Sequence, residues 1–309
     1  IMKAIMYHYV RPSNYDLPYS KYLHVDDFVK QLDYFGNVFG FTNKEDFQES
    51  ISSAKPSTGV VLTFDDGFKD HYHYVLPKLL EYGLWGIFYI PISPLLTDKL
   101  IDVHRIHQLI GKHGGKTIAD ALQGILTKDM LSHERVKEFQ SETYKKQNND
   151  SSTNYVKRAL NYFIDYRYRE NVIEQLMSDF YPNESDLTHN FYMTSAELEH
   201  MHNSGMVLGS HTVNHPVMSK ISIDDQKREI MQSFDMIESI TGEIALKTFC
   251  YPYGGFHTFT SQTERLLEEN GCLFSFNVES RDINQEDLIN RRQALPRFNC
   301  NEFPYGSRR

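Results

Sequence analysis

The stretch VVLTFDDG, residues 60–67, joins a run of apolar and β-branched residues to two adjacent aspartates and a glycine. A short apolar run bounded by a turn signal is typical of a buried strand, so we expect a strand over residues 59–64. A turn from strand into helix needs only one polar capping residue, but Asp65 and Asp66 supply two carboxylates. Either one caps a helix while the other is solvated, or one binds a metal ion while the other moves protons.

The same order, a short apolar run followed by a helical pattern, recurs along the chain. Further strands are expected at residues 3–10, 85–91, 206–210, 246–252, 272–278 and 294–300. The helical patterns cover residues 71–83, 194–205, 222–242 and 260–271. The second begins with a capping box, in which Thr194 is the N-cap and Glu197 stands three residues on. Repeated strand–helix units predict an α/β fold with a parallel sheet, either open or closed as a barrel.

Residues 98–190 differ from the flanking sequence, because they are rich in Lys, Glu, Gln, Asn and Tyr and carry long helical runs. We expect a helical insertion within one domain that spans residues 1–309. The insertion either covers the site as a lid and influences substrate choice, or lies away from the substrate. Its GKHGGKT stretch, residues 111–117, approaches a phosphate-binding loop, but the glycine spacing is one residue short and no clear strand precedes it.

Composition restricts the possible partners of the protein. The net charge of −9 with no long basic run argues against nucleic acid as a partner. No stretch approaches the roughly 20 apolar residues of a transmembrane helix. The N-terminus enters a strand-like run directly, which favours a cytoplasmic or membrane-peripheral protein, with export after removal of a leader left open. Three widely spaced cysteines without a CxxC pair are expected to be buried, reduced thiols.

A second group of polar residues follows another expected strand. In GSHTVNHP, residues 209–216, His211 and His215 stand four residues apart. One helical turn would bring both imidazoles to one side, where they can share a metal ion. The carboxyl ends of parallel strands build the sites of α/β folds, so an aspartate from residues 65–66 can join them. Two imidazoles and one carboxylate suit Zn²⁺, with Co²⁺, Ni²⁺ or Fe²⁺ as alternatives.

The stretches TFDDG, HTVNHP and YPYGG resemble the motifs of the polysaccharide deacetylases, the NodB-homology or carbohydrate esterase 4 family. They occur in the family's order, each after an expected strand, and the resemblance covers both flanks of the insertion but not the insertion itself. It implies a distorted (β/α)7 barrel. It also implies a metal-dependent hydrolase that removes N-acetyl groups from amino sugars in a polysaccharide, oligosaccharide or glycan precursor.

The resemblance also implies a role for each matching residue. Asp66, His211 and His215 would bind the metal, and Asp65 would be the general base. The backbone N–H of Tyr253 would help stabilise the tetrahedral oxyanion, while its side chain either joins in or lines the substrate groove. The two adjacent aspartates would therefore divide metal binding and proton transfer between them.

The third motif departs from the family, where many members have an arginine that orients the base. This chain has Tyr251 at that position. Arg297, in the stretch ALPRFNC, is the expected replacement, although a salt bridge at the rim is an alternative role for it. Arg291 and Arg292 compete for the same assignment.

The family's late histidine, a general acid, has no evident counterpart, since His257 is the only histidine after Tyr253. The N-terminal stretch MYHYV is similar to the first strand of the biofilm poly-N-acetylglucosamine deacetylases, whose motif order looks circularly permuted. His8 is therefore expected to protonate the leaving amine. The alternative is a strand histidine with a structural role only.

Two other functions remain open for this sequence. The same residues would suit hydrolysis of an N-formyl group or an O-acetyl ester on a related sugar. A catalytically silent sugar-binding barrel is the alternative outside the enzymes, although binding alone needs no base beside the metal ligands. In each case the expected partner is a glycan.

Overall fold

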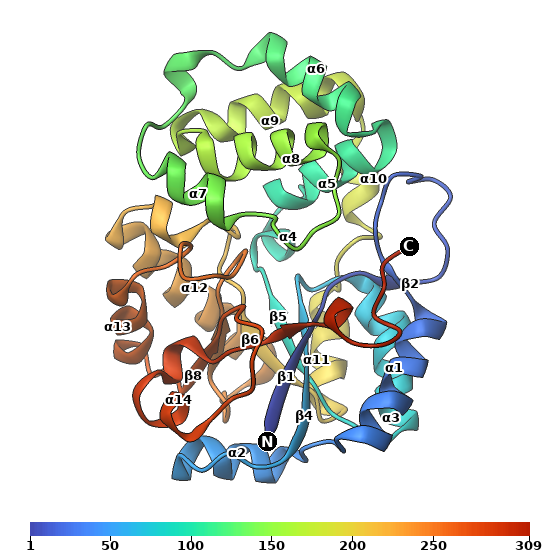
Figure 1. The fold of residues 1–309 in the computed structure, drawn as a ribbon, viewed down its shortest axis with the longest axis vertical. Coiled ribbons are helices and arrows are strands. Elements are labelled where there is room, and N and C mark those ends of the chain that lie inside the picture. The colour runs from blue at the N-terminus through green and yellow to red at the C-terminus, as the bar shows by residue number, and fades with distance from the viewer.

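The computed structural model describes residues 1–309 and contains one seven-stranded sheet in which all neighbouring strands are parallel (Figure 1). The strands lie in the order β8-β7-β6-β5-β4-β1-β9. Their bounds are β1 Met2–Tyr7, β4 Gly59–Asp65, β5 Ile87–Ile90, β6 Val207–Ser210, β7 Thr248–Cys250, β8 Phe274–Phe276 and β9 Phe298–Asn299. A separate pair, β2 (Val10–Arg11) and β3 (Leu23–His24), flanks the sheet.

The sheet curls until its two edges meet across a short segment. Leu295 forms a parallel bridge with Phe276, and its carbonyl accepts a hydrogen bond from the Asn277 N–H at 2.8 Å. A few residues later, β9 pairs with β1. The segment 295–299 therefore joins the edge strand β8 to β1, and the predicted distorted (β/α)7 barrel is confirmed.

Helices surround the curled sheet. They are α1 Val25–Val38, α2 Lys44–Ser53, α3 Leu76–Glu81, α11 Ser195–Asn203, α12 Ile223–Thr241, α13 Ser261–Glu269 and α14 Gln285–Asn290. The expected helix 71–83 begins as a π-helical turn, His71–Val75, before α3. At α11 the predicted capping box is present, because Thr194 and Glu197 each accept the backbone N–H of the other.

The alternation of side chains along β4 explains where Asp65 points. Val60, Leu62 and Phe64 belong to the core cluster between the sheet and the outer helices. Val61 belongs to a different cluster, which lies inside the barrel. Since successive side chains of a strand point to opposite faces, Asp65 shares the inner face with Val61. The strand thus delivers a carboxylate into the barrel at its carboxyl end.

The helices of the expected insertion form a layer over one end of the barrel, at the top of Figure 1. After the short helix α4 (Ser93–Leu96) they are α5 Asp102–His113, α6 Gly115–Ile125, α7 Val136–Glu142, α8 Ser151–Arg158, α9 Tyr166–Phe180 and α10 Glu184–Thr188. Of these, α5, α6, α8 and α9 with adjoining residues share a core of 15 buried residues, including Ile106, Leu122, Leu160 and Ile173. The GKHGGKT stretch joins α5 to α6, so no strand precedes it and it is no phosphate-binding loop.

The sequence also led to expectations about the cysteines and about membrane-spanning helices. All three cysteines are buried free thiols, as predicted. No helix has both the length and the apolar character that a membrane crossing requires.

Candidate functional site

Three side chains meet above the carboxyl ends of β4 and β6. Asp66 follows β4 directly and His211 follows β6 directly. The Oδ1 atom of Asp66 lies 3.3 Å from Nε2 of His211 and 3.4 Å from Nε2 of His215. All three side chains are buried. The structure thus brings together the three residues that the resemblance assigns to the metal.

The donor atoms of this group fit a metal ion. Donors about 3.4 Å apart are what a tetrahedral sphere with bonds of about 2.1 Å requires. No hydrogen bond reaches the buried Oδ1 of Asp66. The Nδ1 atom of His211 lies 2.8 Å from the carbonyl oxygen of Cys250, and an N–H donated there leaves Nε2 with its lone pair free. Oδ1 and the two Nε2 atoms are therefore available as ligands.

The loop that carries the two histidines is not the helical turn that their spacing suggested. Residues 211–217 contain no helix, and both Thr212 (φ 67°) and His215 (φ 56°) adopt left-handed backbone conformations. The hydroxyl of Thr212 accepts the N–H of His215 at 2.9 Å. Glu229 of α12 accepts the N–H groups of Val213 and Asn214 at 2.8 Å each. Side-chain hydrogen bonds therefore set the loop, and the helical expectation is wrong.

Asp65 is paired with Arg297. The two Nη atoms of Arg297 donate to Oδ1 and Oδ2 of Asp65 at 2.9 and 2.8 Å, and both side chains are buried. Burial raises the pKa of Asp65, but the charge and hydrogen bonds of Arg297 outweigh this and bring it below its usual value. Arg291 stacks on Phe256 instead, and Arg292 donates to a backbone carbonyl. Of the three arginines, only Arg297 reaches the carboxylate.

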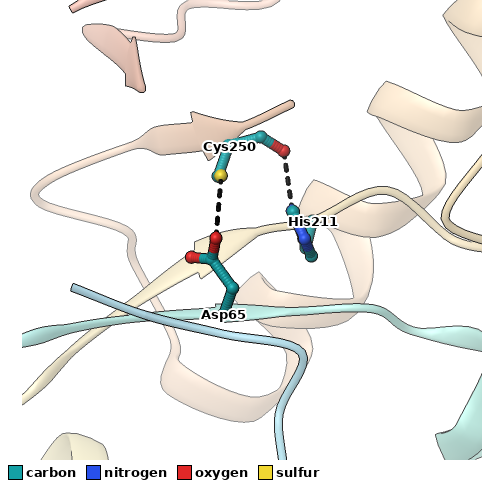
Figure 2. Close-up of side chains that lie close together, drawn as sticks. All are labelled: Asp65, His211 and Cys250. Carbon is teal, nitrogen blue, oxygen red and sulfur yellow. Dashed lines mark hydrogen bonds between the residues drawn. The ribbon is translucent and has the colours of Figure 1, made fainter. Parts of the chain in front are cut away.

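Cys250 is a neighbour that the sequence did not single out (Figure 2). Its Sγ atom lies 3.6 Å from Oδ2 of Asp65 and 2.9 Å from Nη2 of Arg297, while its carbonyl oxygen faces His211. The donors of Asp65, His211 and Cys250 lie within 4.8 Å of one another. Burial raises the pKa of the thiol, and the guanidinium occupies both carboxylate oxygens. These contacts disfavour a second metal site there.

His8 follows β1 and stands at the open side of Asp65. Its Nε2 atom lies 3.9 Å from Oδ2 of Asp65, and its side chain is 31% exposed. No hydrogen bond engages its Nδ1. Desolvation lowers the pKa of His8 to about 4, although Asp66 and Asp65 act in the opposite direction. The imidazole is therefore neutral near pH 7 in the resting protein.

Tyr253 connects the third motif to the inserted helices. Its backbone is left-handed (φ 68°), and no hydrogen bond engages its N–H. The ring lies 4.8 Å from that of His215. Its hydroxyl donates to Oδ1 of Asn161 at 3.1 Å and accepts from Nη2 of Arg169 at 2.9 Å. The side chain is thus fixed by the insertion, and the N–H is free to act as a donor.

His104, on α5, is a second residue that the sequence did not indicate. Its side chain is fully buried, with Nε2 3.1 Å from Oδ2 of Asp66 and Nδ1 2.6 Å from the hydroxyl of Tyr192. Burial lowers the pKa of His104. Burial raises the pKa of Asp66, but its histidine contacts, that of His104 foremost, hold it well below the usual range. The motifs could not indicate His104 because it lies in the insertion, which the resemblance does not cover.

Comparisons with known proteins agree with this geometry. The polysaccharide deacetylase family model matches residues 172–274, a range that includes His211, His215 and Tyr253. No curated protein matches the chain. The resemblance to the polysaccharide deacetylases is confirmed by this match together with the fold.

Several solved structures share the fold at low sequence identity. The Streptococcus pyogenes deacetylase PplD, in complex with acetate, matches with a TM-score of 0.60 and 15% identity over 99% of this chain and 95% of its own. IcaB from Ammonifex degensii matches with a TM-score of 0.56 and 15% identity over 96% and 91%. The de-N-acetylase from Aggregatibacter actinomycetemcomitans gives 0.54 and 14% over 96% and 94%. The likeness extends over nearly the whole chain, insertion included.

Proposed function

We propose that this protein is a metal-dependent hydrolase that removes the N-acetyl group of an amino sugar in a polysaccharide, oligosaccharide or glycan precursor. The observation that carries the proposal is the convergence of Asp66 Oδ1 and the Nε2 atoms of His211 and His215 beside a second, separately held carboxylate. The family match supports the sugar deacetylase class.

In this proposal Asp66, His211 and His215 hold one divalent ion, with Zn²⁺ the first choice and Co²⁺, Ni²⁺ or Fe²⁺ as alternatives. When bound, the ion supplies Lewis acidity for the amide carbonyl and acidifies a nearby water. Asp65 takes a proton from the water that attacks the carbonyl carbon. Arg297 keeps this carboxylate ionised and fixes its orientation through two hydrogen bonds.

The remaining groups act on the oxygen and nitrogen of the scissile amide. The free N–H of Tyr253 stabilises the oxyanion that forms when the carbonyl is attacked. His8 donates a proton to the amine as the C–N bond breaks, which leaves acetate and a free amino sugar. Because His8 is neutral before the reaction, we assign its proton to Asp65, whose Oδ2 lies 3.9 Å from Nε2. One water proton thus passes from Asp65 through His8 to the leaving nitrogen.

Two other functions compete with this proposal: hydrolysis of a different group on the sugar, and sugar binding without catalysis. Removal of an N-formyl group or an O-acetyl ester would need the same residues, so product analysis must separate these reactions. A silent sugar-binding barrel would need neither a base nor an arginine buried against it, and the Asp65–Arg297 pair speaks against that function. We further propose that the chain is a single catalytic domain with residues 98–190 as its helical insertion, and that it binds no nucleic acid.

The decisive test combines metal analysis with product analysis. The wild-type protein loaded with Zn²⁺ should release acetate from an N-acetylglucosamine oligomer, and a chelator should abolish the release. Asp65→Asn should retain the metal but lose activity on the order of 10²–10⁴-fold, because the base is gone and the ligands remain. Asp66→Asn is the matched control that should lose the metal itself. A near wild-type rate for Asp65→Asn would show that Asp65 has only a structural role.

A further inference from the structure

His104 brings the inserted helices into direct contact with a proposed metal ligand. It comes from α5, whereas Asp66 comes from the end of β4, and the two side chains meet at 3.1 Å (Nε2 to Oδ2). The contact falls short of hydrogen-bond geometry, and the buried Nε2 has no other partner. His104 is also absent from the group of donors that lie within 4.8 Å of one another, so it stands beside the ligands rather than among them.

The hydrogen bonds around Tyr192 determine which nitrogen of His104 carries the proton. The Tyr192 hydroxyl accepts the backbone N–H of Ile101 at 3.1 Å. Its own proton is then free to point at Nδ1 of His104, 2.6 Å away. With Nδ1 accepting, a neutral imidazole carries its proton on Nε2, which faces Oδ2 of Asp66. The donors thus point from Tyr192 through His104 toward the carboxylate, with the last two atoms 3.1 Å apart.

This chain divides the two oxygens of Asp66 between different partners. Oδ2 lies 3.1 Å from Nε2 of His104, and Oδ1 faces the two imidazoles of the ligand group. We propose that His104 is a positioning residue, which holds Asp66 so that Oδ1 alone is presented to the metal ion. The inference rests on the proposed function, since it concerns the affinity of that same metal site.

The surroundings of His104 keep its ring in place. The rings of Phe68 and Phe191 lie 4.8 and 5.2 Å from its ring, centroid to centroid. Asp66 itself has a left-handed backbone (φ 82°), which fixes the direction of its side chain. In such a dry site a hydrogen bond to a carboxylate is stronger than in water, and losing it leaves a buried charge unpaired. Partners of metal ligands of this kind typically change metal affinity about 10–100-fold when they are removed.

The test is a Zn²⁺ titration in competition with a chromophoric chelator. His104→Ala should weaken Zn²⁺ binding by about 10–100-fold. His104→Gln should recover most of the affinity, because its amide N–H reaches the position of Nε2 and can donate to Asp66. Tyr192→Phe should weaken binding in the same direction but less. The matched control is His113→Ala on the same helix, whose ring packs on Phe180 and Tyr181, and which should bind Zn²⁺ as the wild type does.

The outcomes separate the two proposals. A wild-type protein that binds none of Zn²⁺, Co²⁺, Ni²⁺ and Fe²⁺ would refute the proposed function itself. If the wild type binds Zn²⁺ and His104→Ala binds it equally well, the role of His104 is refuted while the function stands. Failure of His104→Gln to recover affinity would refute the donor role in particular. Should His104→Ala not fold, Tyr192→Phe decides: weaker Zn²⁺ binding supports the donor chain, and unchanged binding refutes it.

Discussion

Asp66, His215 and Tyr253 share a backbone conformation that side-chain-bearing residues rarely adopt, with φ values of 82°, 56° and 68°. Each costs on the order of 1 kcal/mol relative to an ordinary conformation. Glycine would remove this cost, but it has no ligand or ring to offer. The site therefore concentrates local strain at the residues whose direction its chemistry depends on, and the surrounding hydrogen bonds hold them there.

Arg297 determines at which pH the proposed base is ionised. Arg297→Gln should move the acid limb of kcat/KM to higher pH, because burial raises the pKa of Asp65 and the opposing guanidinium would be gone. In the wild type Asp65 stays ionised at pH values below the usual pKa of an aspartate. Activity should be lost only as the pH falls through the lowered pKa of Asp65. A pH–rate profile measures the shift. Arg291→Gln, which does not touch Asp65, is the control, and an unmoved limb in Arg297→Gln would contradict the pairing.

The turnover lost when His8 is removed should depend on how much the leaving group needs a proton. His8→Ala should depress turnover of an N-acetyl amide by about 10²–10⁴-fold, because the amine must be protonated as it leaves. An activated acetyl ester, whose leaving group needs no proton, should lose far less. Parallel rate measurements on both substrates decide this. Equal losses would assign His8 a structural role and make His257, whose buried Nε2 is also unpaired, the next candidate.

At the scale of elements, the third motif depends on two consecutive glycines after Tyr253. Gly254 has φ +70°, and a Cβ there would lie 2.3 Å from Cγ2 of Val278. The N–H of Gly255 donates to Oδ1 of Asn277 at 2.7 Å, which ties the turn to the segment after β8. The turn that presents the Tyr253 N–H is therefore packed too closely for any side chain.

Gly254→Ala should lower the free energy of unfolding by roughly 1–3 kcal/mol, because the added methyl overpacks against Val278. Urea denaturation measures the change. Gly124→Ala is the control: a Cβ at that exposed position of α6 meets nothing within 4 Å, so it should be neutral or slightly stabilising. Unchanged stability in Gly254→Ala would mean that the turn adjusts at little cost.

The sequence was most informative where a local rule decides an element. The apolar run before Asp65 predicted β4, and Thr194 with Glu197 predicted the start of α11. The spacing of His211 and His215 predicts a helical turn, but Glu229 of α12 holds a non-helical loop instead. A contact such as His104 to Asp66 depends on how α5 crosses the barrel. No local pattern in the insertion encodes that path.

At the scale of the whole molecule, the proposed metal joins segments that are far apart in the chain. Asp66 belongs to the first half of the barrel, and His211 and His215 follow the insertion. Since the unfolded chain cannot bring these ligands together, the metal should bind the folded state selectively. Free Zn²⁺ at 100 times its Kd should then stabilise the protein by about 2.7 kcal/mol.

Thermal denaturation with Zn²⁺ and with a chelator measures this stabilisation. The wild type should melt at a higher temperature when loaded. Asp66→Ala should melt at one temperature in both conditions, because it lacks the ligand that comes from β4. A wild-type melting temperature that changes with neither Zn²⁺ nor chelator would contradict a specific metal site.

The inserted helices have a core of their own, but two of their side chains also contact the barrel. His104 lies beside Asp66, and Arg169 donates a hydrogen bond to the hydroxyl of Tyr253. This combination limits how the protein can be re-engineered. Replacing the helices with those of a protein of the same fold would exchange a well-packed unit. It would also remove a neighbour of the proposed metal ligand and an anchor of the third motif. A working chimera would have to transplant both contacts with their partners. Helices and barrel are therefore expected to be inherited as a matched pair rather than as interchangeable modules.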